Sequence, residues 1–300
     1  MTKPANHAFR LKMAKQKAEA FLRDEGITIL PVLPIEIAKS RDIEVNPMPE
    51  SSGGVSGMLL RHGDEFGILY ATHVKSEGFQ NFSVAHELGH YLLDGHIDHI
   101  LPADGGHTSH AGFVSADTYE LEADQFAAGL LMPAGPFKRA LGQSDAGLEA
   151  VESLARLCHT SLTATAIRYA ELTNDPVAII ISTGAVVDFC FFSDAIKSLP
   201  QLTWLRRGMP VPRRTQTAQL GADASWIASG DRLEAEIDIM DWLGGTRSAS
   251  GIEQSLGLGS YGKTLTVLTC TSLKDDTYGE DDDGDSEEDM AERWTPRFPR

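Results

Sequence analysis

The segment AHELGHYLLDGH constrains this chain more than any other stretch of its 300 residues. On a helix, residues four apart share one face, so His86 and His90 would present both imidazoles to one ion, with Glu87 beside them. Three leucines in the same segment would bury the helix, so the histidines would lie in the interior of the protein. We therefore predict a buried metal-binding helix that begins at a cap formed by Ser83 and extends to Asp94.

A catalytic metal of this type needs a third protein ligand and one open position. His96 has the spacing of the HExxHxxGxxH pattern, but Leu93 stands where that pattern needs a glycine. A helix of the predicted length would place His96 about 9 Å beyond His90 along the helix axis, at roughly 1.5 Å per residue. His96 is therefore expected to overshoot the metal, and the third ligand is sought elsewhere in the chain.

A second helix, predicted over residues 118–131 and ended by Pro133, offers the other candidate. Glu120 shares a face with two alanines that would let the helices approach closely, whereas Glu122 lies about 200° around and faces elsewhere. One turn after Glu120, Asp124 is placed to accept the second N–H of a ligating histidine. The alternatives are a capping-box role for Glu120 and a solvent-exposed helix face for Asp124.

FSVAHELGHYLL, followed some thirty residues later by ELEADQFAAGLLMP, resembles the ImmA/IrrE family of bacterial metallopeptidases. The resemblance is specific over residues 80–133 and looser over the rest of the N-terminal half. It implies zinc, with manganese as the alternative, as the metal held by His86, His90 and Glu120. It also implies that Glu87 is the catalytic base, which takes the proton of the attacking water during peptide hydrolysis.

The resemblance further implies an α+β fold with several parts. We expect a zincin-like metallopeptidase domain over residues 1–145, a helix-turn-helix-like segment over 146–174, and a strand-rich, GAF-like domain over 175–273. The last domain is supported by β-branched and aromatic runs at residues 177–182, 185–192, 233–239 and 264–270. Residues 274–300 are expected to form a disordered acidic tail, because they combine many carboxylates with few apolar side chains.

Two strands are predicted before the first metal helix, over residues 57–60 and 66–71. The second of them is a candidate edge to which an extended substrate could pair, and an ordinary buried strand is the equal alternative. Residues 95–112 are expected to form a loop whose extra histidines are exposed to solvent. A further ligand from these histidines, at positions 96, 99, 107 and 110, stays an open alternative.

These features favour a metalloendopeptidase that cleaves a regulatory protein, with a helix-turn-helix transcriptional repressor as the expected substrate in a stress or mobile-element response. The alternatives are a metal-bound sensor without hydrolysis and a DNA-binding regulator with a protease-like fold. The presence of Glu87 favours the enzyme over the sensor, because a metal-binding module without hydrolysis needs no base beside its metal. DNA binding is not expected, because Arg168 is the only basic residue in the second helix of the segment 154–172.

The chain is expected to be a cytoplasmic protein. This expectation rests on a first segment that does not resemble a secretory signal and on apolar runs shorter than a membrane span needs. Its cysteines are odd in number and far apart, which argues against a disulfide framework. Apart from the metal, no cofactor is expected, and no contact with a membrane.

Overall fold

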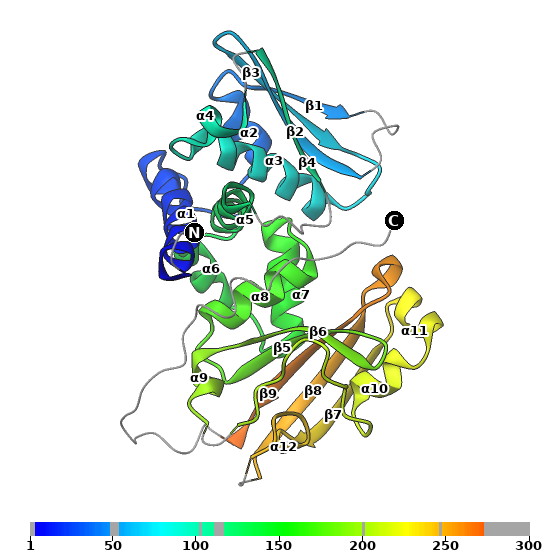
Figure 1. The fold of residues 1–300 in the computed structure, drawn as a ribbon. Coiled ribbons are helices and arrows are strands. Elements are labelled where there is room, and N and C mark those ends of the chain that lie inside the picture. The colour runs from blue at the N-terminus through cyan, green and yellow to red at the C-terminus, as the bar shows by residue number, and fades with distance from the viewer. Residues whose placement is uncertain are drawn as a thin grey trace. The chain divides into compact units, whose positions relative to one another are not determined.

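The computed structural model describes residues 4–48, 54–101, 104–110, 117–199, 202–245 and 248–272. These residues form a mixed α+β structure with two β-sheets (Figure 1). They divide into two compact units. The first unit consists of the described residues before Leu141 together with Leu154–Ser161, and the second consists of Leu141–Ser153 and the described residues from Leu162 onward. The predicted acidic tail, residues 274–300, lies outside the described residues.

The first unit contains a four-stranded sheet and a group of helices. The helices are α1 (Pro4–Asp24), α2 (Pro34–Lys39), α3 (Glu77–Leu92), α4 (His96–Ile100), α5 (Thr118–Leu131) and α6 (Ala134–Leu141). The strands are β1 (Glu44–Met48), β2 (Val55–His62), β3 (Glu65–Ala71) and β4 (Asp104–His110), in the order β1-β3-β2-β4. β1 runs parallel to β3, and the other neighbouring strands are antiparallel.

α3 connects the sheet to the other helices of the first unit. It packs against β2 and β3 and also against α5, and α5 in turn packs against α1. The approach of α3 to α5 is close, because a Cβ placed on Gly89 would lie 3.2 Å from the Cα of Ala123. A Cβ on Gly129 of α5 would lie only 2.7 Å from the carbonyl oxygen of Lys15 in α1. Small residues at these crossings therefore let the helices that carry the candidate ligands come together.

α3 begins earlier than the sequence predicts. The Ser76 side chain caps it by accepting a hydrogen bond from the Phe79 N–H at 3.3 Å. Ser83, the predicted cap, is instead buried within the helix and donates to the Phe79 carbonyl oxygen at 2.9 Å. The helix also ends before its predicted end, at Leu92, and Gly95 then adopts a left-handed conformation with a φ of 78°. This turn allows α4 to start immediately and to fold back along α3.

Two other expectations for the first unit are corrected by the structure. β3 lies between β1 and β2, so the alternative of an internal strand is right and β3 offers no edge to a substrate. Residues 95–112 are not a plain loop, because their described part contains α4 and β4. Since β4 ends the strand order, it takes the place of β3 as the candidate edge.

The second unit contains a five-stranded antiparallel sheet in the order β6-β5-β9-β8-β7. The strands are β5 (Val177–Thr183), β6 (Val186–Phe192), β7 (Arg232–Asp238), β8 (Ser250–Gly257) and β9 (Thr264–Cys270). The helices are α7 (Gly147–Cys158), which continues into the first unit, α8 (Leu162–Leu172), α9 (Asp194–Lys197), α10 (Gln216–Gly221), α11 (Ala224–Ser229), α12 (Met240–Leu243) and the 3-10 helix η1 (Gly259–Tyr261). The four predicted strand runs correspond to β5, β6, β7 and β9, whereas β8 and the helices from α9 onward are not predicted by the sequence.

Part of one face of the second sheet carries an apolar core that includes Ile180, Trp242 and Leu268. All three cysteines of the chain are free in this structure. Among the described residues, no helix combines the length and the apolar character needed to cross a bilayer.

Candidate metal centre

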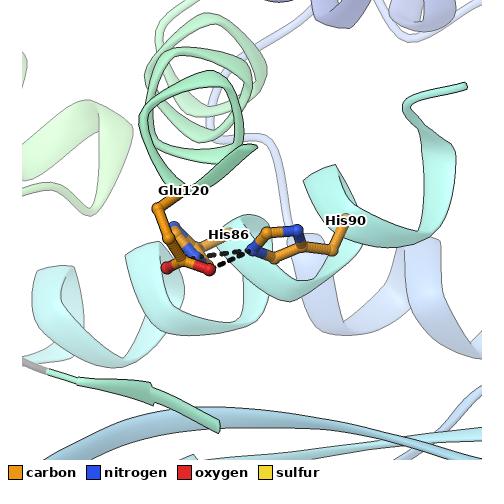
Figure 2. Close-up of side chains that lie close together, drawn as sticks. All are labelled: His86, His90 and Glu120. Atoms are coloured by element: carbon orange, nitrogen blue, oxygen red, sulfur yellow. Dashed lines mark hydrogen bonds and ion pairs between the residues drawn. The ribbon is translucent and has the colours of Figure 1, made fainter. Parts of the chain in front are cut away.

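Three candidate metal ligands from two helices converge in the first unit (Figure 2). His86 and His90 extend from neighbouring turns of α3, and their Nε2 atoms lie 3.1 Å apart. Glu120, in the first turn of α5, reaches both histidines. Its Oε2 lies 3.3 Å from Nε2 of His86, and its Oε1 lies 3.3 Å from Nε2 of His90. The structure thus brings together the three residues that the sequence singles out.

The spacing of these atoms fits a single divalent metal. Zinc binds nitrogen and oxygen ligands at about 2.0 to 2.2 Å, so two ligands of a tetrahedral site lie roughly 3.3 Å apart. The two Nε2 atoms lie 3.1 Å apart, and each lies 3.3 Å from a different oxygen of Glu120, which is close to that spacing. Two imidazoles and one carboxylate are also a donor set typical of catalytic zinc, which leaves a fourth position for substrate or water. The cluster can therefore hold a metal ion.

Glu87 lies beside this cluster and is fully buried. Neither of its carboxylate oxygens makes a well-formed hydrogen bond to any described residue. Its Oε1 lies against β2 at Gly57, where a Cβ would approach it to 2.5 Å, so a side chain at this position would displace the carboxylate. Burial raises the pKa of the Glu87 carboxyl to about 7, and the neighbouring His86 acts in the opposite direction. Glu87 is thus poised to exchange a proton near neutral pH.

The pKa shifts of the ligand residues agree with metal binding. Burial lowers the pKa of His90 to about 3, which keeps its imidazole neutral. Burial acts to raise the pKa of Glu120, but contacts with three histidines outweigh it and hold the pKa far below its usual range. For His86, burial acts to lower the pKa, and contacts with Asp124 and Glu120 raise it well above its usual value instead. The carboxylates around His86 therefore create a strong attraction for positive charge.

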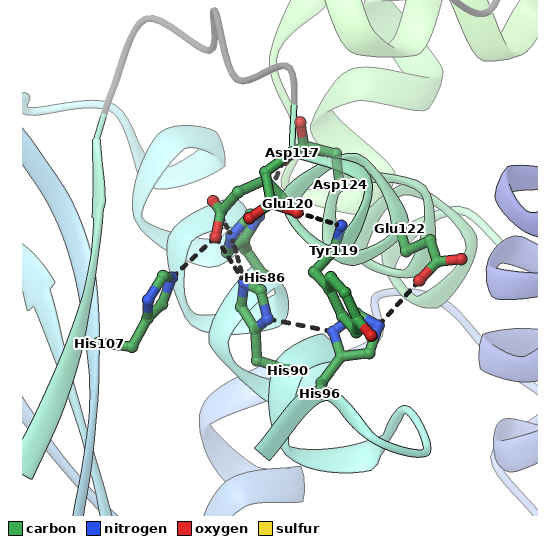
Figure 3. A network of polar contacts seen from close by, with 9 residues as sticks. All are labelled: His86, His90, His96, His107, Asp117, Tyr119, Glu120, Glu122 and Asp124. Carbon is green, nitrogen blue, oxygen red and sulfur yellow. Dashed lines mark hydrogen bonds and ion pairs between the residues drawn. The ribbon is translucent and has the colours of Figure 1, made fainter. Parts of the chain in front are cut away.

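Asp124 lies on the other side of His86 from Glu120. Its Oδ1 is 2.8 Å from Nδ1 of His86, and both side chains are buried. A hydrogen on Nδ1 shared with this carboxylate leaves the Nε2 lone pair of His86 free to face the other two ligands. Asp117 caps α5 by accepting from the Tyr119 N–H at 2.9 Å, while the Glu120 carboxylate lies with the histidines (Figure 3).

The histidines of the segment 95–112 do not share one environment. His96 is buried and its Nδ1 lies 3.1 Å from Nδ1 of His90, on the side of that ring opposite His86 (Figure 3). His107 is half-buried on β4, and its Nε2 lies 2.7 Å from Oε1 of Glu120. Only His99 and His110 are exposed, so the expectation of solvent-exposed histidines is wrong for the other two.

Sequence reasoning missed why His96 and His107 matter. The overshoot expected for His96 assumed an uninterrupted helix, and the left-handed Gly95 invalidates that assumption by folding the chain back. A glycine just after the last helical turn is a recognised stop signal and could have suggested the fold-back. Glu122 faces away from the three ligands, as its position around α5 indicates, and contacts His96 at 3.1 Å. His107 was not expected near the ligands because β4 is rich in glycine, which is uncommon in strands, so no strand was predicted there.

Comparisons with known proteins identify a family match over the part of the chain that carries these residues. Residues 38–169 match the sequence model of the Peptidase_M78 family, described as the IrrE N-terminal-like domain. No curated protein sequence gives a significant match. A solved structure of a Mycobacterium tuberculosis transcriptional regulator is similar to this chain with a TM-score of 0.53 and 15% sequence identity. The similarity covers 86% of this chain and 76% of that one, and at this identity it concerns the fold alone.

The matched region contains the whole candidate centre. The two histidines and Glu87 of α3, and Glu120 and Asp124 of α5, all fall within residues 38–169. The sequence resemblance, the family match and the converging donor atoms thus point to the same part of the chain. Residues 38–169 thus carry an IrrE N-terminal-like domain, and this match supports membership of the ImmA/IrrE family.

Proposed function

We propose that this chain is a zinc-dependent endopeptidase that cleaves a regulatory protein. The observation that carries the proposal is Glu87, a buried carboxylate without a well-formed hydrogen bond to any described residue, placed beside three convergent metal donors. Burying a carboxylate without a well-formed hydrogen bond costs free energy, so its place next to the metal donors calls for a reason. A structural zinc site with four protein ligands would have no use for it. A hydrolytic site needs a base at this position.

The chemistry follows from the residues present. A divalent metal at this site supplies Lewis-acid activation of a water molecule and of a peptide carbonyl. Glu87 accepts the proton of the attacking water and then delivers it to the leaving amine as the C–N bond breaks. The raised pKa of Glu87 suits both roles, because the carboxylate is ionised before the attack and protonated after it.

The substrate is proposed to bind along β4. This strand ends the sheet, so no described strand pairs with the backbone groups on its outer side. Its His107 contacts the ligand Glu120, which places the strand beside the site (Figure 3). An extended peptide that added to β4 would form backbone hydrogen bonds of the β-sheet type and present its scissile bond to the metal donors.

The proposed substrate class is a helix-turn-helix transcriptional repressor, cleaved in a stress or mobile-element response. Membership of the ImmA/IrrE family supports a regulatory role. A transcriptional regulator also has a similar fold, which is compatible with that role. The second unit, with a sheet and helices of its own, gives the enzyme a place to sense a signal or to dock a partner.

Direct DNA binding by α8 is not favoured by the structure. Arg168, the only basic residue of this helix, is buried with 5% of its surface exposed. Its guanidinium contacts the carboxylate of Glu171 at 2.8 Å. Because phosphate contacts need exposed cationic side chains, α8 is better suited to packing than to a DNA groove.

The proposal is tested by incubating the zinc-loaded protein with each transcriptional repressor encoded beside its gene. We expect one of them to be cut at a single site, which mass spectrometry of the fragments would locate. The matched control is Glu87→Gln, which keeps the shape of the side chain and cannot accept a proton. Cleavage of casein at rates typical of digestive zinc proteases would contradict a regulatory substrate. Transcriptional control that persists with Glu87→Gln would support the alternative of a metal-bound sensor without hydrolysis.

A further inference from the structure

The two candidate imidazole ligands are oriented in different ways. His86 Nδ1 meets a carboxylate directly, since Asp124 Oδ1 lies at 2.8 Å. His90 Nδ1 instead meets another imidazole, because His96 Nδ1 lies at 3.1 Å. A ligating histidine usually gives its second N–H to a carboxylate, a carbonyl or a water. The partner of His90 is therefore an unusual one.

His96 is the first residue in a chain of polar contacts that begins at His90 and extends away from the ligands (Figure 3). Its Nε2 lies 3.1 Å from Oε2 of Glu122 on α5. Arg10 of α1 donates to the same carboxylate through Nε at 2.5 Å and through Nη2 at 2.8 Å. His96 is 1% exposed and Glu122 is 7% exposed, so the contacts between them are shielded from water.

Only one arrangement of hydrogens satisfies the whole chain of contacts when His90 binds a metal through Nε2. Neutral His90 then carries its hydrogen on Nδ1 and donates it to Nδ1 of His96. Neutral His96 accepts there, so it carries its own hydrogen on Nε2 and donates it to Glu122. Arg10 holds Glu122 from the other side with two parallel hydrogen bonds, the geometry in which arginine fixes a carboxylate best.

We propose that His96 is a positioning residue, which Glu122 and Arg10 hold in place and which keeps His90 in its metal-binding tautomer and orientation. The inference rests on the metal site of the proposed function and concerns metal binding itself. In this account His96 is not a ligand, because both of its ring nitrogens are engaged on the far side of His90.

The same contacts give α1 a part in the metal site. Arg10 lies outside residues 38–169, the region that matches the family model, and is separated from Glu122 by more than a hundred residues of sequence. α1 packs along α5, and this packing delivers the guanidinium to the carboxylate. The support of His90 therefore extends from α3 through α4 and α5 to the N-terminal helix.

The test compares zinc affinity and the cobalt(II) absorption spectrum in variants of the full chain. His96→Ala is expected to weaken zinc binding about 10- to 100-fold, as loss of an outer partner does, and to change the cobalt spectrum by freeing His90 to reorient. His96→Asn is expected to recover most of the affinity, because its amide oxygen can replace Nδ1 as the acceptor. Asp98→Ala, at an exposed position of the same helix, is the control and should bind like the parent.

A variant that simply unfolds is recognised from the melting temperature of the metal-free protein. Arg10→Met then provides a second test, since it breaks the chain of contacts at its outer end and leaves His96 in place. It should weaken zinc binding in the same direction, by a smaller factor. If both His96→Ala and Arg10→Met bind zinc as tightly as the parent, with an unchanged cobalt spectrum, the inference is overturned.

Two further outcomes separate this inference from the proposed function. If His96→Ala and His96→Asn lose zinc as completely as Glu120→Ala, His96 is itself a ligand and the positioning role is wrong. If the parent binds zinc and the variants behave as expected, but no repressor is cleaved, the proposed function fails while the positioning role stands.

Discussion

Each of the two units buries a cluster of polar side chains around a glutamate, and the clusters differ in what their atoms face. The first is the metal-site cluster of His86, Glu87, His90 and Glu120. The second, which we call the Glu253 cluster, consists of Thr217, Glu253, Ser255 and Thr266. Apart from Glu120, which is partly exposed, all of these residues are buried, so burial alone does not distinguish them.

The Glu253 cluster is held by hydrogen bonds to one carboxylate oxygen, Oε1, whereas Oε2 of Glu253 has no hydrogen-bond partner among the described residues. The backbone N–H and the hydroxyl of Thr217 both donate to Glu253 Oε1, at 2.8 and 2.7 Å. The same hydroxyl lies 2.9 Å from Ser255 Oγ and 2.6 Å from Thr266 Oγ1. Because a hydroxyl both donates and accepts, these contacts can share their hydrogens and tie the start of α10 to β8 and β9.

In the metal-site cluster, acceptor lone pairs face one another once both histidines take the neutral form that binds a metal. With Nδ1 protonated, a neutral imidazole offers only a lone pair at Nε2, and an ionised carboxylate has no hydrogen to give. The two Nε2 atoms lie 3.1 Å apart, each lies 3.3 Å from one of the two oxygens of Glu120, and Glu87 adds two more oxygens without a well-formed partner. A shortage of hydrogens, more than burial, therefore distinguishes a cation site from a structural network.

The largest effect is expected from Glu87→Gln. The variant should lower the rate of substrate cleavage about 10²- to 10⁴-fold, the contribution of a general base, because an amide cannot take the proton. Zinc content and melting temperature should stay near those of the parent, since the amide has almost the same shape. The kinetics of cleavage by both zinc-loaded proteins check this, and equal rates would remove Glu87 from the mechanism.

Glu120→Ala is expected to weaken metal binding more than any change outside the three ligands. The loss should exceed the roughly 10- to 100-fold effect of an outer partner, because a whole ligand is removed. Competition with a zinc-binding dye would measure it. Glu65→Ala, an exposed glutamate on β3, serves as the control and should leave the affinity unchanged. Retained affinity in Glu120→Ala would require another third ligand.

Asp124→Ala should have an intermediate effect. Without its carboxylate, His86 loses the contact at Nδ1 that selects its metal-binding tautomer, so zinc affinity should fall about 10- to 100-fold. The three ligands would remain, and excess zinc should therefore restore cleavage. If saturating zinc leaves the variant inactive, Asp124 has a role beyond holding His86.

The smallest effect on the metal site is expected from Glu253→Ala, and it tests the other half of the comparison. Removal of the carboxylate leaves the backbone N–H of Thr217 without its acceptor, at a cost of about 1 to 3 kcal/mol in the free energy of unfolding. Zinc affinity should not change. Denaturant unfolding and zinc titration of the same sample would show both results, and a large loss of zinc affinity would break the contrast between the two clusters.

The sequence predicts the ligand helices well because helical spacing is a local property. His86 and His90 share a face of α3 whatever surrounds them, and the predicted bounds of the second helix match α5. The cap was misplaced at Ser83 because a serine before an apolar run also suits a buried position within a helix. There its hydroxyl is satisfied by a carbonyl one turn earlier, so the true cap is Ser76.

Features that depend on tertiary contacts were not predictable in the same way. β1 was missed because Pro47 lies inside it, and without β1 the strand β3 reads as an edge. β8 was missed because its buried face carries Glu253 and Ser255, so the apolar alternation of a strand is absent. The contact between Arg10 and Glu122 joins residues far apart in the sequence, so no local sequence pattern predicts it.

The most direct test of the central claim is a crystal structure of the zinc-loaded protein with anomalous data at the zinc edge. We predict one strong anomalous peak per chain, about 2.0 to 2.2 Å from His86 Nε2, His90 Nε2 and a carboxylate oxygen of Glu120. The Glu87 carboxylate should face the remaining coordination position, and His96 should contact only the far side of His90. A peak coordinated by His96 or His107 in place of Glu120, or no peak at α3, would contradict the account.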